Sequence, residues 1–377
     1  MQRTAKSTKR LPLFEQPSPI RIHYLGWARP ILHSACDYLF EQYLRGHEWN
    51  LDRVLLVLPG SLAGRRLQIL LAERAAREDV VLRPPEILTL GKLPERLYQA
   101  KLPFANELDQ VMAWTKVLQS PPASELKPLL FEVPQVDELA PWMELARILG
   151  SLHRELASDL LDFSDVADSL TGTAEEPRWH VLATLQRRYL DVLHQASLWD
   201  VQTARQFALK HGEVQPSGHE IVLIGTVDLN RAQRQFLAAV GQQVTSLIGA
   251  PDTFSQGFDA DGTLRSEFWQ RLELPIDDDA LHVRSTVRDA ADELAVQLAL
   301  LGSDRAPSQI TVGVPDPTVI PAFQESLQRA GVHLRYGPGL PIQATQPTKL
   351  LGLIQRYLAN GEIEAFHSLV RETTVED

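Results

Sequence analysis

The chain has 377 residues, enough for roughly two or three domains, and its 44% hydrophobic and 23% charged residues are ordinary for a folded protein without membrane spans. A single cysteine, Cys36, excludes an internal disulfide, a four-cysteine zinc site and an iron–sulfur cluster built from this chain alone, and it favours a reducing cytoplasm. The net charge of −11 argues against a surface coated in positive potential but permits a local basic groove.

Residues 1–20 carry basic side chains without an apolar core, so they predict a disordered basic arm and not a secretory signal. No apolar run is long enough to cross a bilayer, so no membrane association is expected.

Residues 21–102 alternate strands with helices, which predicts the first part of an α/β domain with a parallel sheet. Val54–Leu58 is a continuous apolar run, as expected of a strand buried on both faces. The predicted elements are strand Arg21–Leu25, turn Gly26–His33, helix Ser34–Arg45, strand Arg53–Leu58, helix Leu62–Arg77 and strand Glu86–Leu90.

Residues 103–200 lose the strand pattern and predict a helical insertion. Leucines recur at helical spacing from Leu145 to Leu160, and again from Leu182 to Leu193. Ser120–Leu126 and Thr171–Glu176 are the expected loops between the helices of this insertion.

Residues 201–276 return to the α/β pattern and predict the second part of the first domain. The expected elements are strand Glu220–Ile224, helix Arg231–Val240, strand Val244–Ile248 and a polar loop at Thr253–Leu264.

Residues 277–377 predict the start of a second α/β domain that is truncated at Asp377, as in a fragment of a longer polypeptide. Asp277-Asp278-Asp279 is the expected linker. The elements are strand Leu281–Arg284, helix Arg288–Leu301, strand Gln309–Val314, helix Val319–Ala330 and helix Lys349–Ala359.

The turn after the first strand occupies the place of a nucleotide-binding P-loop but lacks its chemistry. A P-loop needs small glycines, a lysine and a Ser or Thr, and here only Gly26 survives. We interpret Gly26-Trp27-Ala28-Arg29-Pro30 as a degenerate P-loop, an inherited strand–helix turn. Nucleotide binding by backbone amides at the helix N-terminus is the alternative.

Three loops that follow predicted strands are candidate DNA contacts, because ligands bind at the C-terminal edge of open parallel sheets. The first supplies Ser61, Arg65 and Arg66, and the second Thr89 and Lys92. The third supplies Arg335 and Tyr336, since an exposed tyrosine beside an arginine suits base stacking. The alternatives are solvated helix-start arginines, a plain helix-start turn and a turn with a half-buried tyrosine.

Other polar clusters favour structural roles. The basic and aromatic residues around Trp179 and Tyr189 fall on an apolar face, so core packing is the interpretation. His153, His180 and His194 have no second ligand one helical turn away, so no metal site is expected. No catalytic residue or cofactor is predicted, since neither a nucleophile elbow nor a paired catalytic carboxylate is recognisable.

The order of these segments resembles the N-terminal helicase-like region of AddB, a subunit of AddAB helicase–nucleases and a relative of the inactivated superfamily 1 helicase RecC. The resemblance covers nearly the whole chain from about residue 20 and rests on the order and spacing of four stretches. These are Leu25–Arg29 at the P-loop position, Val57-Leu58-Pro59 with the following helix at motif Ia, Ile221–Gly225 at the Walker B position, and Gln309–Arg335 at the start of the second motor domain.

The departures from this pattern decide the expected function. Ile224 and Gly225 stand where Walker B would place the acids that hold magnesium and position water, so we call them a degenerate Walker B. The resemblance implies a P-loop-like (RecA-like) fold and a non-hydrolytic, DNA-guiding module of a DNA repair nuclease. Its implied partners are single-stranded or duplex-end DNA and an AddA-like motor subunit. This chain by itself is not expected to be catalytic, although the parent protein could carry exonuclease activity.

Two alternatives stay open. One is a nucleotide-binding or regulatory α/β protein, for which we expect a compact pocket with charged residues around Gly26, Asp228 and Asp252. The other is a purely structural interaction module, which the acidic net charge permits.

Overall fold

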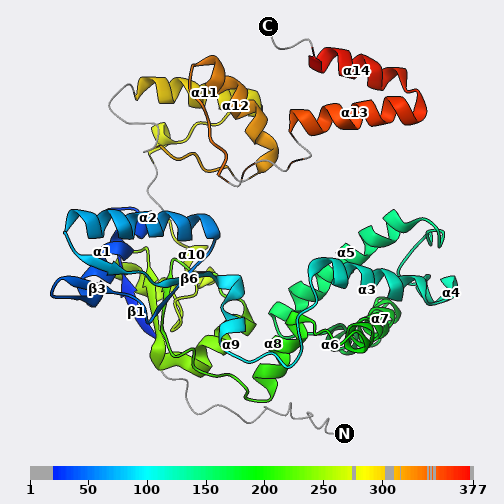
Figure 1. The fold of residues 1–377 in the computed structure, drawn as a ribbon, viewed down its shortest axis with the longest axis horizontal. Helices are drawn as coiled ribbons and strands as arrows, with labels where there is room; N and C mark the ends of the chain where they lie inside the picture. Colours follow the sequence, from blue (N-terminus) through cyan, green and yellow to red (C-terminus); the bar gives the residue numbers. More distant parts are fainter. Residues whose placement is uncertain are drawn as a thin grey trace. The chain divides into compact units, whose positions relative to one another are not determined.

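The structure, a computed structural model, describes residues 20–273, 277–301, 310–314, 316–337, 339, 342 and 345–373. The predicted basic arm therefore lies outside the described residues except for Ile20. The chain forms two compact units, Met1–Leu272 and Glu273–Asp377, so the boundary lies a few residues before the predicted one (Figure 1).

The first unit contains a parallel five-stranded sheet, as predicted. The strand order is β1-β8-β7-β4-β6, and each neighbouring pair runs in the same direction. The strands are β1 (Arg21–Tyr24), β4 (Val54–Leu58), β6 (Glu86–Thr89), β7 (Glu220–Ile224) and β8 (Val244–Ile248). β4 and β8 are buried at every residue, which fits their inner positions in the sheet; β4 is an apolar run, whereas β8 also buries Thr245 and Ser246.

Helices cover both faces of this sheet and create two hydrophobic cores. Alternate residues of β4 point to opposite faces, so Leu56 joins one core and Leu55 joins the other. The covering helices are α1 (Ile31–Tyr43) and α2 (Ser61–Arg77) on one face, and α8 (Val201–Lys210) and α9 (Arg231–Val240) on the other. α1 begins three residues before the predicted start, because Pro30 at its N-cap has a φ of −55° that suits helix entry.

A second, three-stranded sheet beside α1 was not predicted. It consists of β2 (Leu44–Arg45), β3 (Glu48–Asn50) and β5 (Val81–Arg83), in the order β2-β3-β5. Each strand has two or three residues, too few for a period-two pattern to be visible. Its fully buried Trp49 donates from Nε1 to the Leu39 carbonyl at 3.1 Å, which fastens the small sheet to α1.

The helical insertion is present and has a hydrophobic core of its own. That core is built around the fully buried Trp142, Phe163 and Tyr189 together with the nearly fully buried Trp114. The helices are α3 (Glu107–Gln119), α4 (Ala123–Leu126), α5 (Leu139–Ser158), α6 (Phe163–Ser169) and α7 (Glu176–Gln195). α5 also contacts α8 and α9, so the insertion packs against the sheet-covering helices (Figure 1).

Short helical turns complete the first unit. The loop predicted at Thr253–Leu264 contains a 3-10 helix and an isolated bridge between Phe258 and Leu264. The turns are η1 (Leu90–Lys92), η2 (Pro94–Arg96), η3 (Gly241–Gln243), η4 (Asp252–Gly257) and the short helix α10 (Ser266–Trp269).

The second unit corrects the prediction of a second α/β domain, since its described residues form helices but no strand. Residues 281–284 and 310–314 have no β-ladder partner, although strands were predicted at Leu281–Arg284 and Gln309–Val314; Gln309 lies outside the described residues. A strand is stable only when neighbours pair with its backbone, and no such neighbour is found in the described part of this unit. Its elements are η5 (Asp278–Ala280), α11 (Val287–Leu300), η8 (Pro317–Val319), α12 (Ile320–Arg329), α13 (Gln346–Asn360) and α14 (Ile363–Thr373).

Candidate nucleic-acid interface

The loops that follow β4 and β6 lie side by side at the C-terminal edge of the sheet. The two strands are parallel neighbours, and Leu58 at the end of β4 pairs in register with Thr89 at the end of β6. The prediction that these strands deliver their loops to one edge is therefore confirmed. Ser61, Arg65 and Arg66 follow β4, and Lys92 follows β6.

The start of α2 presents its polar face because the opposite face is held against β6. Gly64 is buried, and a Cβ at this position would lie 3.1 Å from Ile87 Cγ2. This leaves Ser61, Arg65 and Arg66 exposed. The N-cap residue is Gly60, and no side chain caps the helix, so first-turn amides of α2 have no side-chain acceptor.

The Lys92 loop is anchored by an arginine from α8. Arg205 Nη2 donates to the Gly91 carbonyl at 2.7 Å, and Arg205 also makes a two-point ion pair with Glu95 at 2.6 and 2.7 Å. Both partners are largely buried, with side-chain exposures of 15% and 23%. Because Arg205 anchors Gly91, the backbone of this loop is held in place. Lys92 itself is exposed, and its ammonium group faces solvent.

Arg65, Arg66 and Lys92 form no ion pair with any described residue. Many other arginines of the first unit are paired with a carboxylate, for example Arg74 with Glu78 and Arg96 with Glu86. This edge therefore carries three uncompensated positive charges in a chain whose net charge is −11. Such charges are available to phosphate groups.

The side chain of Ile31 lies on the same C-terminal edge of the sheet, at the ends of β7 and β8 beside the degenerate P-loop. A Cβ placed on Gly225 would lie 3.2 Å from Ile31 Cδ1, and one placed on Gly249 would lie 3.0 Å from the same atom. Gly225 directly follows β7 at the degenerate Walker B, with Ile224 buried before it, and Gly249 directly follows β8. An aliphatic side chain therefore lies between the P-loop position and the Walker B position.

Three residues of the degenerate P-loop are engaged in internal contacts. Trp27 Nε1 donates to the Gly249 carbonyl at 2.7 Å, so this acceptor is occupied. The Arg29 guanidinium pairs with Asp37 on α1 and does not replace the missing P-loop lysine. Gly26 has a φ of +74° and donates its amide to the Ala250 carbonyl at 3.0 Å. Ala28 and Pro30 complete the turn, and Pro30 has no amide hydrogen to offer.

A groove of about 810 Å³ runs between the end of α5 and the start of α9. It contains Asp228, but its lining does not include Gly26 or Asp252, so this groove is not the compact pocket expected from the nucleotide-binding alternative. Four carboxylates line it against two guanidiniums, and one of these, Arg234, is already paired with Asp259 and Asp261. The excess of negative charge is unfavourable for a phosphate.

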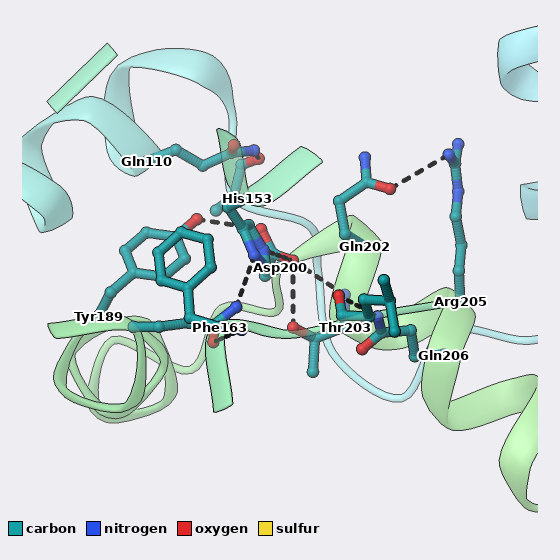
Figure 2. A network of polar contacts seen from close by, with 12 residues as sticks. Gln110, His153, Phe163, Tyr189, Asp200, Gln202, Thr203, Arg205 and Gln206 are labelled. Atoms are coloured by element: carbon teal, nitrogen blue, oxygen red, sulfur yellow. Dashed lines mark hydrogen bonds and ion pairs between the residues drawn. The ribbon is translucent and has the colours of Figure 1, made fainter. Parts of the chain in front are cut away.

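A buried polar network joins the helical insertion to α8, and Figure 2 shows His153, Tyr189 and Thr203 directed toward Asp200. His153 Nε2 lies 3.0 Å from Asp200 Oδ1, and the Tyr189 hydroxyl donates to Asp200 Oδ2 at 3.0 Å. The Thr203 amide donates to Asp200 Oδ1 at 2.9 Å, which makes Asp200 the N-cap of α8.

The protonation of this network follows from its hydrogen bonds. Gln186 Oε1 accepts from the Phe163 amide at 3.0 Å, so the amide nitrogen of Gln186 faces His153 Nδ1 at 2.9 Å. Nδ1 is then an acceptor, and Nε2 donates its proton to Asp200. Burial alone would raise the pKa of Asp200, but the hydrogen bonds from His153, Thr203 and Tyr189 outweigh it, and the pKa is lowered.

This network lies in the interior and has a positional role. His153 and Asp200 are 4% and 1% exposed, too little for contact with a ligand from solvent. It fixes the start of α8, and α8 in turn carries Arg205, which anchors the Lys92 loop. The helical insertion and the cationic edge are thereby connected through one helix.

Two predicted site residues belong to the second unit. Arg335 is exposed and Tyr336 is half-buried, which matches the alternative of a turn with a half-buried tyrosine. Thr89, in the first unit, is half-buried as the residue before η1. In the described residues, no group of three or more His, Cys, Asp or Glu side chains is arranged to hold a metal ion. None of the described helices is both long and apolar enough to cross a membrane.

Sequence reasoning missed the roles of Arg205, Asp200 and His153. Two signals were present: Asp200 directly precedes a helical pattern, as N-cap residues do, and His153 falls on an apolar helix face between Leu149 and Leu156. A buried polar side chain at such a position requires a partner. Arg205 gives no comparable signal, because its partners Gly91 and Glu95 are more than a hundred residues away.

Comparison with known proteins adds no identity to these observations. No protein-family model matches the chain, and no curated protein matches it in sequence.

Proposed function

We propose that this chain is a helicase-like module without ATP hydrolysis that guides single-stranded or duplex-end DNA and serves as partner of an active motor subunit, as in an AddB-type DNA repair nuclease. The observation that carries the proposal is the contact of Ile31 with Gly225 and Gly249. A helicase motor that has lost ATP hydrolysis would retain the sheet edge of a nucleotide site. An aliphatic side chain would then stand where the phosphates bind in an active motor.

The DNA part of the proposal is supported by exposed cations that follow β4 and β6 on the same C-terminal edge of the sheet. Arg65 and Arg66 sit at a helix start with uncapped amides, and Lys92 sits on an anchored loop. Backbone amides at a helix N-terminus and unpaired cations are the groups that contact phosphates in a sequence-independent manner. A scaffold that guides a strand requires contacts of this kind.

The partner-protein part of the proposal comes from the resemblance, with support from exposed apolar side chains on the helical insertion. Phe131 is fully exposed, Val136 is 73% exposed and Ile148 is 58% exposed. Exposed apolar residues gathered on one subdomain suit a protein contact. A cytoplasmic location, which the single buried Cys36 favours, belongs to the same proposal.

The experiment is a binding titration of the chain with a fluorescent oligothymidylate and with a duplex that has a single-stranded end, at low and at physiological salt. We expect anisotropy to rise with protein, and the affinity to fall as salt increases. In parallel, the chain is co-expressed with an AddA-type motor subunit, and co-purification is expected. Absence of DNA binding at both salt concentrations, together with absence of co-purification, contradicts the proposal.

A further inference from the structure

Trp27, a residue of the degenerate P-loop, packs against a group of aromatic side chains. Its ring centroid lies 4.9 Å from that of Phe254, and the two ring planes are tilted by 31°. Phe254 is in turn stacked on Trp269, at 5.8 Å and 22°. Trp269 is held by its own hydrogen bond from Nε1 to the Gly257 carbonyl at 2.7 Å.

The position of Trp27 is fixed although the residue is exposed. Its Nε1 donates to the Gly249 carbonyl at 2.7 Å, so the only polar atom of the indole is satisfied inside the protein. The side chain is nevertheless 53% exposed, while Phe254 and Trp269 are half-buried beneath it. A ring that is both fixed and open to solvent is suited to stack a planar ligand.

We infer that Trp27 is a stacking platform for a nucleobase of a single DNA strand that crosses the C-terminal edge of the sheet. This inference rests on the proposed DNA-guiding function and adds a second contact to it. Base–aromatic stacking is tolerant of sequence, because every base has a π-face. The occupant follows from the position of the ring, since Trp27 and the cations Arg65, Arg66 and Lys92 lie on the same edge.

The distance between the two contacts is compatible with one strand. β1, which Trp27 follows, is three positions from β4 in the sheet, and strands are spaced by about 4.8 Å, so the loops are roughly 14 Å apart. The charges near Trp27 itself do not favour phosphate: Arg29 is paired with Asp37, and Asp252 on the loop that carries Phe254 is exposed. The base is therefore expected to contact Trp27, and the phosphates to contact the cations.

The test compares two ligands of equal length and charge, an oligothymidylate and an oligomer with abasic sites in place of bases. Trp27→Ala is expected to weaken oligothymidylate binding by roughly 5- to 150-fold, the range of one base stacked on an aromatic ring. Binding of the abasic oligomer and the salt slope should not change, since no phosphate contact is removed. Trp27→Tyr should keep most of the affinity, because it keeps a ring on Phe254. Tyr357→Ala, which removes an exposed aromatic side chain of the second unit, is the matched control.

The outcomes separate this inference from the proposed function. If the unaltered chain binds oligothymidylate and Trp27→Ala binds it equally well, the stacking platform is wrong while DNA guiding stands. If Trp27→Ala weakens both oligomers to the same degree, Trp27 supports the structure of the edge and stacks no base, which also overturns the inference. If the unaltered chain binds neither oligomer, the proposed DNA function itself fails.

Discussion

Ile31 and Gly249 are in contact at the C-terminal edge of the parallel sheet, with Ile31 Cδ1 only 3.0 Å from where a Gly249 Cβ would lie. β8, which ends one residue before this glycine, separates β1 from β7 in the sheet. The contact thus lies between the ends of the two strands that we compare with the P-loop strand and the Walker B strand of an active NTPase.

This contact predicts a coupling between the two residues. Gly249→Ala should lower the free energy of unfolding by about 1–2 kcal/mol, because the added methyl group overpacks the site. In an Ile31→Val background, which removes Cδ1, the cost of Gly249→Ala should fall by at least about 0.5 kcal/mol. Urea unfolding of the four proteins measures the coupling. Gly91→Ala is the control, since nothing lies within 4 Å of its Cβ. Strictly additive effects would show that Ile31 does not fill this space.

Arg65→Ala combined with Arg66→Ala should weaken binding of single-stranded DNA. If each arginine contacts one phosphate, the slope of log affinity against log salt should become shallower by roughly 1.4. Anisotropy titrations over a range of salt concentrations provide the slope.

The matched control for this pair is Arg147→Ala combined with Arg187→Ala, which removes two exposed arginines from the helical insertion. This control changes the net charge equally, so its slope should stay close to that of the unaltered chain. An unchanged slope in the Arg65 and Arg66 variant would refute the assignment of phosphate contacts to α2.

Much of the first unit could be predicted from sequence because β4 and β7, at the centre of the sheet, are dominated by apolar residues. β7 and β8 have the predicted bounds, and α9 has them as well. The adjacency of the Ser61–Arg66 and Gly91-Lys92 loops also follows, since parallel strands deliver their C-terminal ends to one edge. These are consequences of local pattern together with one topological rule.

What failed depended on partners distant in sequence. The strands of the small sheet are two or three residues long. β2 and β3 form a tight hairpin, and β3 gains its second partner, β5, only from beyond β4 and α2. Residues 310–314 have the composition of a strand, but composition does not supply the neighbouring strand that pairing requires. Arg205 is similar, because its ion pair with Glu95 spans 110 residues.

Arg205→Lys is predicted to loosen the Lys92 loop while keeping the charge. A lysine cannot make both the two-point ion pair with Glu95 and the hydrogen bond to the Gly91 carbonyl, so unfolding should become easier by about 1–3 kcal/mol. Single-strand affinity should fall as it does in Lys92→Ala, and the double variant should show no further loss. Arg188→Lys, at an exposed ion pair with Glu125, should have little effect. Additive losses of DNA affinity would show that Arg205 does not act through Lys92.

Asp200→Asn tests the buried network. The new amide group would face the donors of His153, Tyr189 and Thr203, so we expect a loss of about 2–4 kcal/mol in the free energy of unfolding. Asp162→Asn is the control, because Asp162 is the N-cap of α6 and asparagine caps equally well. Equal losses of unfolding free energy in both variants would show that Asp200 acts only as the N-cap of α8.

The same network predicts a dependence on pH. The pKa of Asp200 is lowered in the folded protein, so the unfolded chain takes up this proton first as the pH falls. The contribution of Asp200 to stability is therefore complete above the unfolded value of about 3.9 and is lost as the pH falls through the folded pKa. The difference in stability between the unaltered chain and Asp200→Asn should shrink below about pH 4. Thermal unfolding between neutral and acidic pH measures this, and a constant difference would contradict it.

The chain is predicted to bind Mg-ATP no more tightly than millimolar and not to hydrolyse it. Ile31 occupies the phosphate space against Gly225 and Gly249, and Trp27 occupies the Gly249 carbonyl. Removing the obstruction should not restore binding, because the lysine that neutralises the phosphates and the acids that hold magnesium are still missing. Calorimetric titration with Mg-ATP should accordingly show no heat of binding for the unaltered chain or for Ile31→Ala. Titration of the same samples with oligothymidylate shows that they are folded and active. Sub-millimolar, magnesium-dependent binding by the unaltered chain would mean that the P-loop remnant is functional and would favour the nucleotide-binding alternative.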